Sequence, residues 1–142
     1  MRYTLALLFV AALSLINGCS GDKAAAITYK YVRQISGEGS TDCGYVRFGE
    51  SAARTDQCVM DAYQKHQPFI ARYDVKGIDS RLVFGLAGDA TQRVVSVKYD
   101  SEGWEPPSRA ASLAEGNHVL LKPCPVPVRF FPKQSGHLAC YE

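Results

Sequence analysis

The chain has 142 residues, of which 46% are hydrophobic and 21% are charged. This length and composition are those of one globular domain, and they exclude a disordered or fibrous protein. Sixteen lysines and arginines against fourteen aspartates and glutamates give a formal net charge of +2. Because a protein that grips a phosphate backbone needs a surplus of basic residues, the composition argues against nucleic acid as a partner.

The first eighteen residues have the order of a signal peptide. Arg2 is the only charged residue before Asp22, and the apolar stretch over residues 3–16 is broken only by Thr4 and Ser14. A membrane-spanning helix needs about 20 apolar residues, so a permanent transmembrane anchor is the less favoured alternative. We predict that residues 1–18 are removed on export.

The end of this leader, Ile16-Asn17-Gly18-Cys19, resembles the lipobox of bacterial lipoproteins, in which an aliphatic residue stands three positions before an obligatory cysteine. The resemblance covers only the leader. It implies cleavage before Cys19 and acylation of its thiol and its new amine, and two or three acyl chains hold a protein durably on a bilayer. By the same resemblance, Ser20 in place of an aspartate favours the outer membrane, with the protein facing the periplasm. Asn17 departs from the usual small or apolar residue, so the alternative is an ordinary signal peptide that leaves Cys19 as an odd thiol.

Four cysteines follow Cys19 in the chain: Cys43, Cys58, Cys124 and Cys140. In an oxidising compartment an even set predicts two disulfides, for which three connectivities are possible. We favour Cys43–Cys58 and Cys124–Cys140, because each closes a local loop of about 15 residues and would stabilise the fold by about 3 kcal/mol.

The sequence gives no support for a metal or a cofactor. No two cysteines lie two to four residues apart, and His66, His118 and His137 are scattered, so the spacing of a structural zinc module is missing. A phosphate-binding loop, a zinc-peptidase helix, a dinucleotide glycine motif and a serine nucleophile elbow do not occur. We therefore expect neither a metal nor a cofactor.

Residues 19–26 are expected to form the lipidated N-terminus and a short tether of small and polar residues. A single domain would then occupy residues 27–142. Alternating β-prone residues over 27–35 predict a first strand. Apolar and small positions recur at three and four between residues 51 and 66, which predicts one helix, ended by Pro68.

Alternation returns over residues 69–76, 82–86 and 95–99, which predicts three further strands. Turn residues connect them closely, as in an antiparallel meander. A fourth strand is expected over 118–122. Prolines after it forbid continuous ladder pairing, so residues 123–142 are expected to be an extended edge segment held by a disulfide.

These elements predict an α+β fold, with one helix packed on an antiparallel sheet of four to five strands and stapled by disulfides. Their order resembles small folds of the cystatin type. The segments Gly-Ile-Asp-Ser at 77–80 and Gly-Leu-Ala at 85–87 resemble segments of small uncharacterised exported proteins of proteobacteria. This last resemblance implies no activity.

The candidate binding loop precedes the fourth strand and carries the only tryptophan, Trp104, between Glu102 and Glu105. A loop of this length without structure of its own is often functional, and tryptophan is a frequent interface anchor. The alternative is that Trp104 folds back over the open face of the sheet.

We expect a non-catalytic lipoprotein, held on the bilayer through acylated Cys19, that binds a protein or another envelope component. One alternative is a small periplasmic enzyme. It would use Cys43 as a thiol nucleophile, or Glu102 and Glu105 as the acid and base of a glycosidase. Another alternative is a purely structural envelope protein.

Overall fold

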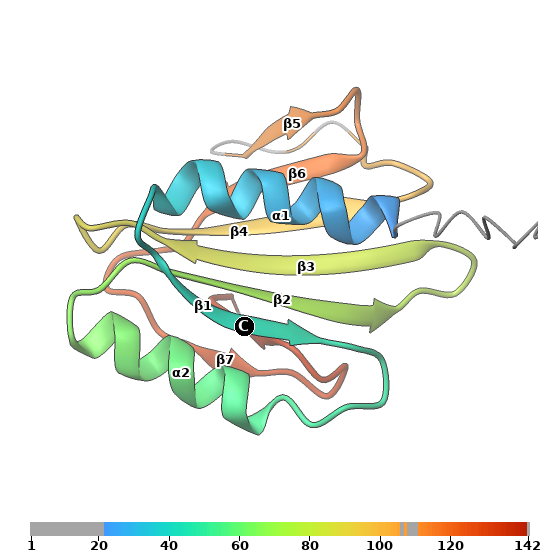
Figure 1. Cartoon of the computed structure of the whole chain (residues 1–142). Helices are drawn as coiled ribbons and strands as arrows, with labels where there is room; N and C mark the ends of the chain where they lie inside the picture. The colour runs from blue at the N-terminus through green and yellow to red at the C-terminus, as the bar shows by residue number, and fades with distance from the viewer. Residues whose placement is uncertain (1–21, 106, 108–110, 142) are drawn as a thin grey trace, which may run out of the picture.

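The computed structural model describes residues 22–105, 107 and 111–141, so the expected signal peptide and Cys19 lie outside the described residues. Within these ranges the fold is α+β, with two helices and eight strands (Figure 1). In chain order they are α1 (Lys23–Ser36), β1 (Thr41–Val46), α2 (Ala53–Gln64), β2 (Phe69–Lys76), β3 (Arg81–Gly88), β4 (Val94–Asp100), β5 (Ser112–Ala114), β6 (Val119–Pro123), β7 (Phe131–Pro132) and β8 (Leu138–Ala139).

The first element is a helix, so the strand predicted over residues 27–35 is wrong. The buried positions Ala24, Thr28, Val32 and Ser36 recur every four residues, which places them on one face of α1. The helix already begins at Lys23, so residues 23–26 belong to the domain and not to the expected tether.

A side-chain cap explains why the helix starts there. The Asp22 carboxylate accepts a hydrogen bond from the Ala25 amide at 3.2 Å, which satisfies one of the free donors of the first turn. Three consecutive alanines after Lys23 also favour the helix. The helical signal therefore lies in the segment assigned to the tether.

Six strands form one sheet in the order β1-β2-β3-β4-β6-β5. The antiparallel meander β2-β3-β4 and the helix α2 are confirmed, and β6 joins the meander antiparallel to β4. However, β1 pairs parallel with β2 through the crossover helix α2, so the sheet is mixed. The expected single helix on four to five antiparallel strands is therefore corrected to two helices and a six-stranded mixed sheet.

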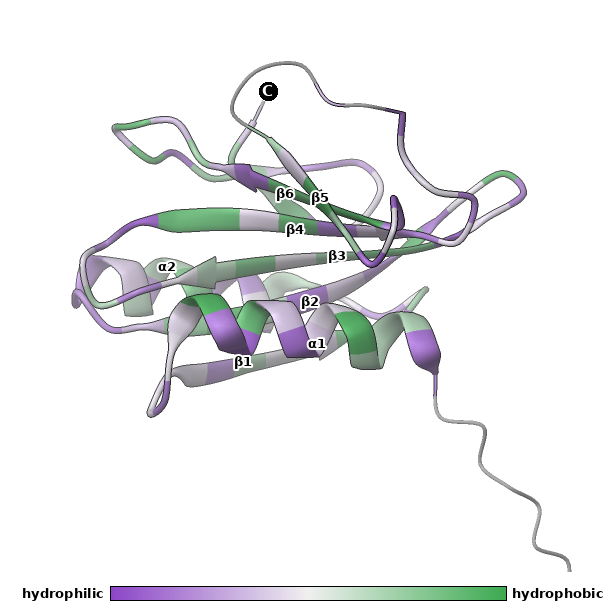
Figure 2. Cartoon of the chain, turned by 90° about the horizontal axis from the view of Figure 1, so that it is seen from above, coloured by the Kyte–Doolittle hydropathy of each residue, from purple (hydrophilic) through white to green (hydrophobic). Residues whose placement is uncertain are grey.

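Each helix covers a different face of the sheet. Helix α1 packs across β2, β3 and β4, where Val32 joins a core that includes Ile70, Val83 and Val97. Helix α2 packs on the other face, against β1 and β2. Figure 2 shows long hydrophobic stretches in β3 and β4, whereas the residues of α1 alternate between hydrophobic and hydrophilic.

The prediction that residues 123–142 form an extended edge segment of the sheet is wrong. Strand β5 pairs with β6 and occupies that edge. Strands β7 and β8 instead pair with each other. Leu138 and Cys140 are buried in the core on the α2 side. The structure contains a Cys124–Cys140 disulfide and a Cys43–Cys58 disulfide, which are the two pairs favoured by loop length.

No helix among the described residues is long and apolar enough to span a membrane.

Candidate functional site

The structure turns the tryptophan of the predicted binding loop back toward the sheet. The indole N–H of Trp104 donates a hydrogen bond to the Lys98 carbonyl of β4 at 3.2 Å, and its amide donates to the Asn117 carbonyl at 2.8 Å. Trp104 is half-buried, whereas Glu102 and Glu105 are exposed. This is the geometry of the alternative in which Trp104 covers part of the sheet. The part of the loop at 106 and 108–110 lies outside the described residues.

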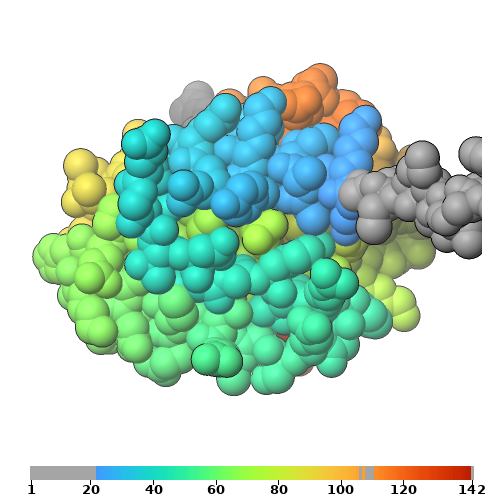
Figure 3. All heavy atoms as spheres, viewed as in Figure 1, coloured from blue at the N-terminus to red at the C-terminus, as the bar shows by residue number. Residues whose placement is uncertain are grey.

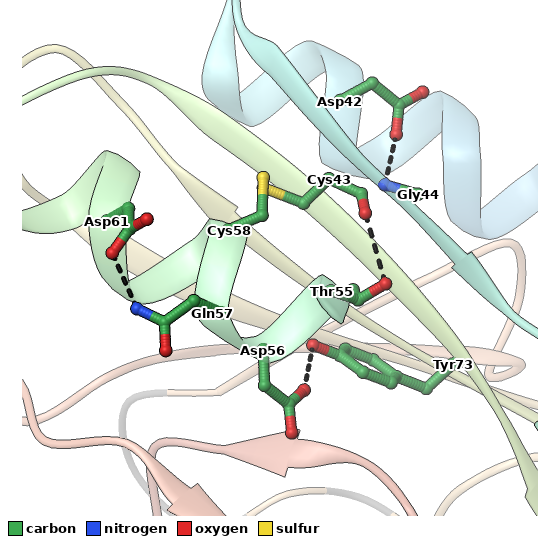
Figure 4. The surroundings of a disulfide bond; sticks show 9 residues. All are labelled: Asp42, Cys43, Gly44, Thr55, Asp56, Gln57, Cys58, Asp61 and Tyr73. Carbon is green, nitrogen blue, oxygen red and sulfur yellow. Dashed lines mark hydrogen bonds between the residues drawn. A yellow bond between two sulfur atoms is a disulfide. The ribbon is translucent and has the colours of Figure 1, made fainter. Parts of the chain in front are cut away.

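The thiol expected for one enzyme alternative is not free. Cys43 on β1 forms a disulfide with Cys58 on α2, so it has no thiol to act as a nucleophile while the bond is intact (Figure 4). The Thr55 hydroxyl donates to the Cys43 carbonyl at 3.1 Å, and the Tyr73 hydroxyl donates to Asp56 at 2.9 Å. Burial raises the pKa of both Tyr73 and Asp56. These contacts fix α2 to β1 and β2.

A group of basic side chains gathers on the α2 side of the sheet, where the C-terminal segment packs beside α2. Val97 and Leu121 face the core under α1, so the alternating neighbours Lys98 on β4 and Lys122 on β6 point to the opposite face. Lys133, next to β7, approaches the same region. We call Lys98, Lys122, Lys133 and His137 the basic cluster.

Aromatic rings support the basic cluster. The Lys98 ammonium lies 5.2 Å from the centroid of the Phe84 ring, and the His137 ring meets Phe84 edge-on with 4.5 Å between centroids. The Lys122 ammonium lies 3.7 Å from the centroid of the Tyr141 ring. Contacts of cations with aromatic rings are favourable but leave the N–H donors of lysine available.

The lysines of the basic cluster affect the titration of their neighbours. Burial, followed by the nearby Lys122 and Lys133, lowers the pKa of Lys98. Burial, followed by Lys98 and Lys133, lowers the pKa of His137 to about 4. Among the described residues, none of the three lysines forms an ion pair. An anion placed here would therefore meet three lysines that no described carboxylate pairs with.

Sequence reasoning did not find this cluster. Lys98 and Lys122 stand at the polar positions of alternating strands, where a solvated lysine is ordinary. They become neighbours only through the register that pairs Ser96 with Lys122, while His137 arrives through the folded C-terminal segment. The other two histidines lie elsewhere: His66 is exposed after α2, and His118 contacts the Asp100 carbonyl through Nδ1 at 3.0 Å.

No protein-family model, curated protein or solved structure matches this chain. Within residues 22–141, as far as they are described, no three histidine, cysteine, aspartate or glutamate side chains are grouped so that they could hold a metal ion. The functional interpretation therefore rests on the chain's own side chains.

Proposed function

We propose that this protein is a bacterial envelope lipoprotein, held on the outer membrane through acylated Cys19, that binds an acidic protein surface in the periplasm without catalysis. The observation that carries the binding role is the basic cluster on the α2 side of the sheet. Three lysines converge there, and none has an ionic partner among the described residues.

The chemistry of the cluster favours carboxylates of a macromolecular partner. An ion pair at an exposed site contributes only about 0.2–1 kcal/mol, so one anionic group would bind weakly. Several carboxylates on one partner surface would add their contributions, and the half-buried Phe84 and Leu120 offer apolar contact on the same face.

Two features support the proposal of an exported protein with a membrane anchor. Both disulfides belong to an oxidising compartment. The domain also begins close to the expected anchor, because α1 starts at Lys23. A tether of so few residues would span only about 10–15 Å, so the domain would be held next to the bilayer.

The anchor is tested by the intact mass of the protein extracted from native membranes and alkylated without reduction. We expect a chain that starts at Cys19, carries acyl chains and has no alkylated thiol. An unlipidated chain would refute the anchor and leave the binding site to be judged separately.

The binding role is tested by photocrosslinking in cells from a photoreactive residue at Gln134, which is exposed beside Lys133. We expect a crosslinked partner whose yield falls about tenfold when Lys98 and Lys122 are both replaced by glutamine, as for two lost charge contacts of about 0.7 kcal/mol each. The matched control replaces the exposed Lys23 and Lys65 by glutamine and should retain the crosslink. Equal yields from the two double variants would refute the basic cluster as the binding site.

A further inference from the structure

A second unpaired cation lies on the opposite face of the sheet. Arg72 of β2 points toward α1, since its neighbour Tyr73 is buried in the core on the α2 side. The guanidinium carbon lies 4.5 Å from the centroid of the Tyr29 ring of α1 and 5.0 Å from that of the Tyr45 ring of β1. The guanidinium is therefore held between rings from two different elements.

The Nε–H donor of Arg72 has no partner among the described residues. Its Nε atom is buried without any hydrogen bond, and it is the only buried side-chain nitrogen or oxygen of this kind among the described residues. The guanidinium also makes no ion pair with a described carboxylate. A buried unsatisfied donor is uncommon in a native protein and calls for a specific explanation, such as an unaccounted ion or water.

The neighbouring arginine shows that carboxylates are present but already engaged. Arg81 of β3 forms ion pairs with Asp74, at 2.8 Å, and with Asp22. Its Nη2 also donates to the Tyr45 hydroxyl at 3.0 Å, and that hydroxyl donates to Asp74. This network fixes the Tyr45 ring against Arg72 and leaves Arg72 without a counterion.

Arg72 as a whole is half-buried, although its Nε atom is fully buried. Tyr29 is 39% exposed, and atoms of the sheet are visible between α1 and β1 in the space-filling view (Figure 3). Guanidinium presents a planar fork of N–H donors that matches two oxygens of one anionic group, and stacking on aromatic rings orients that fork.

We propose that Arg72 is the anchor of an oxyanion-binding site between α1 and β1, which takes the carboxylate or phosphate group of a small molecule. Tyr29 and Tyr45 flank the bound group, and Arg72 donates to two of its oxygens. This site lies on the other face of the sheet from the basic cluster and stands independently of the function proposed above.

The direct test is a nuclear magnetic resonance titration of the full chain in non-ionic detergent, in which the Arg72 Nε–H signal is followed. Sodium phosphate and sodium acetate are added in separate series at constant ionic strength, with sodium chloride as the reference. We expect a saturable shift of this signal in the millimolar range with phosphate, acetate or both, and none with chloride. The anion that shifts it identifies the source of the oxyanion.

Variants separate this site from general salt effects. Arg72→Lys keeps the charge but loses the fork. Because this variant has no Arg72 Nε–H, binding to it and to the wild type is compared through the backbone amide signals of Tyr29 and Tyr45, whose rings contact Arg72. We expect binding to weaken about tenfold or more, the loss of at least one charge-assisted hydrogen bond. The control Arg54→Gln removes an exposed arginine of α2 and should leave the titration unchanged. The proposal is overturned if neither oxyanion shifts the Arg72 signal saturably, or if Arg72→Lys binds as tightly as the wild type.

Discussion

The contact between α1 and the sheet depends on the absence of a side chain at Gly85 of β3. A Cβ atom at this position would lie 2.6 Å from Cγ1 of Val32 and 3.1 Å from Cγ2 of Thr28. Carbon atoms in favourable contact are about 3.5–4.0 Å apart, so Gly85→Ala forces α1 or the Val32 side chain to move. Val32 and Thr28 are fully buried, so neither can turn out into solvent. We expect the substitution to lower the free energy of unfolding by about 2 kcal/mol, as overpacking of a core does.

The assay is equilibrium unfolding in urea with both disulfides intact, completed as a double-mutant cycle. Val32→Ala alone leaves a cavity and should also cost about 2 kcal/mol. In Gly85→Ala/Val32→Ala the added methyl group occupies space that Val32 gives up, so the double variant should be at least about 1 kcal/mol more stable than the sum of the single effects predicts. Additive costs, or a Gly85→Ala variant within about 0.5 kcal/mol of the wild type, would show that α1 does not approach β3 at this point.

Three further predictions concern a histidine, a disulfide and the tryptophan. Burial beside lysines holds the pKa of His137 at about 4 in the folded state. The unfolded chain therefore takes up a proton at this histidine near pH 6.5, whereas the folded chain does so only near pH 4. The free energy of unfolding is fully retained above pH 6.5 and falls as the pH drops toward 4, by less than about 1.4 kcal/mol per pH unit because solvent screens the charge. His137→Gln should flatten this part of the stability curve measured by urea unfolding. Replacing Cys43 and Cys58 together by serine should cost about 3 kcal/mol in the same assay, and an unchanged midpoint would mean that the bond does not form. Trp104→Phe removes the indole N–H that donates to the Lys98 carbonyl, together with part of the ring, and should cost at least about 1 kcal/mol. A tryptophan that points into solvent would leave stability unchanged.

The parts of the fold that could be predicted are those in which one periodicity stands alone. Residues 71–76 alternate between apolar and charged side chains and, with the buried Phe69 and Ile70 before them, form β2, because only one register of side chains can face each core. The positions of α2 recur at three and four over residues 51–66, and Pro68 ends the pattern. In these segments local pattern and tertiary packing agree.

The parts that failed are those in which two signals compete. The segment 27–35 alternates β-prone residues, but the helix that it joins buries Thr28 and Val32 together with Ala24 from the preceding segment. Alanine is only weakly hydrophobic, so the pattern from Ile27 onward does not show the complete buried face of α1. Strand β1 contains aspartate and glycine, which are poor strand formers. Its pairing with β2 and the disulfide to α2 hold it in the sheet.

Both candidate sites depend on which cations the carboxylates pair with in the folded protein. The nearly neutral composition of the chain does not reveal this pairing. The four ion pairs among the described residues use Lys30, Arg81 and Arg93 as their cations. Arg81 alone engages two aspartates, and the adjacent Arg72 has none. On the opposite face none of the three lysines of the basic cluster forms an ion pair with a described carboxylate. A small net charge therefore argues against long-range attraction of a polyanion, but it does not argue against local recognition of an anionic group. Local recognition depends on the pairing of individual side chains, and that pairing is fixed only when strands distant in sequence come into register.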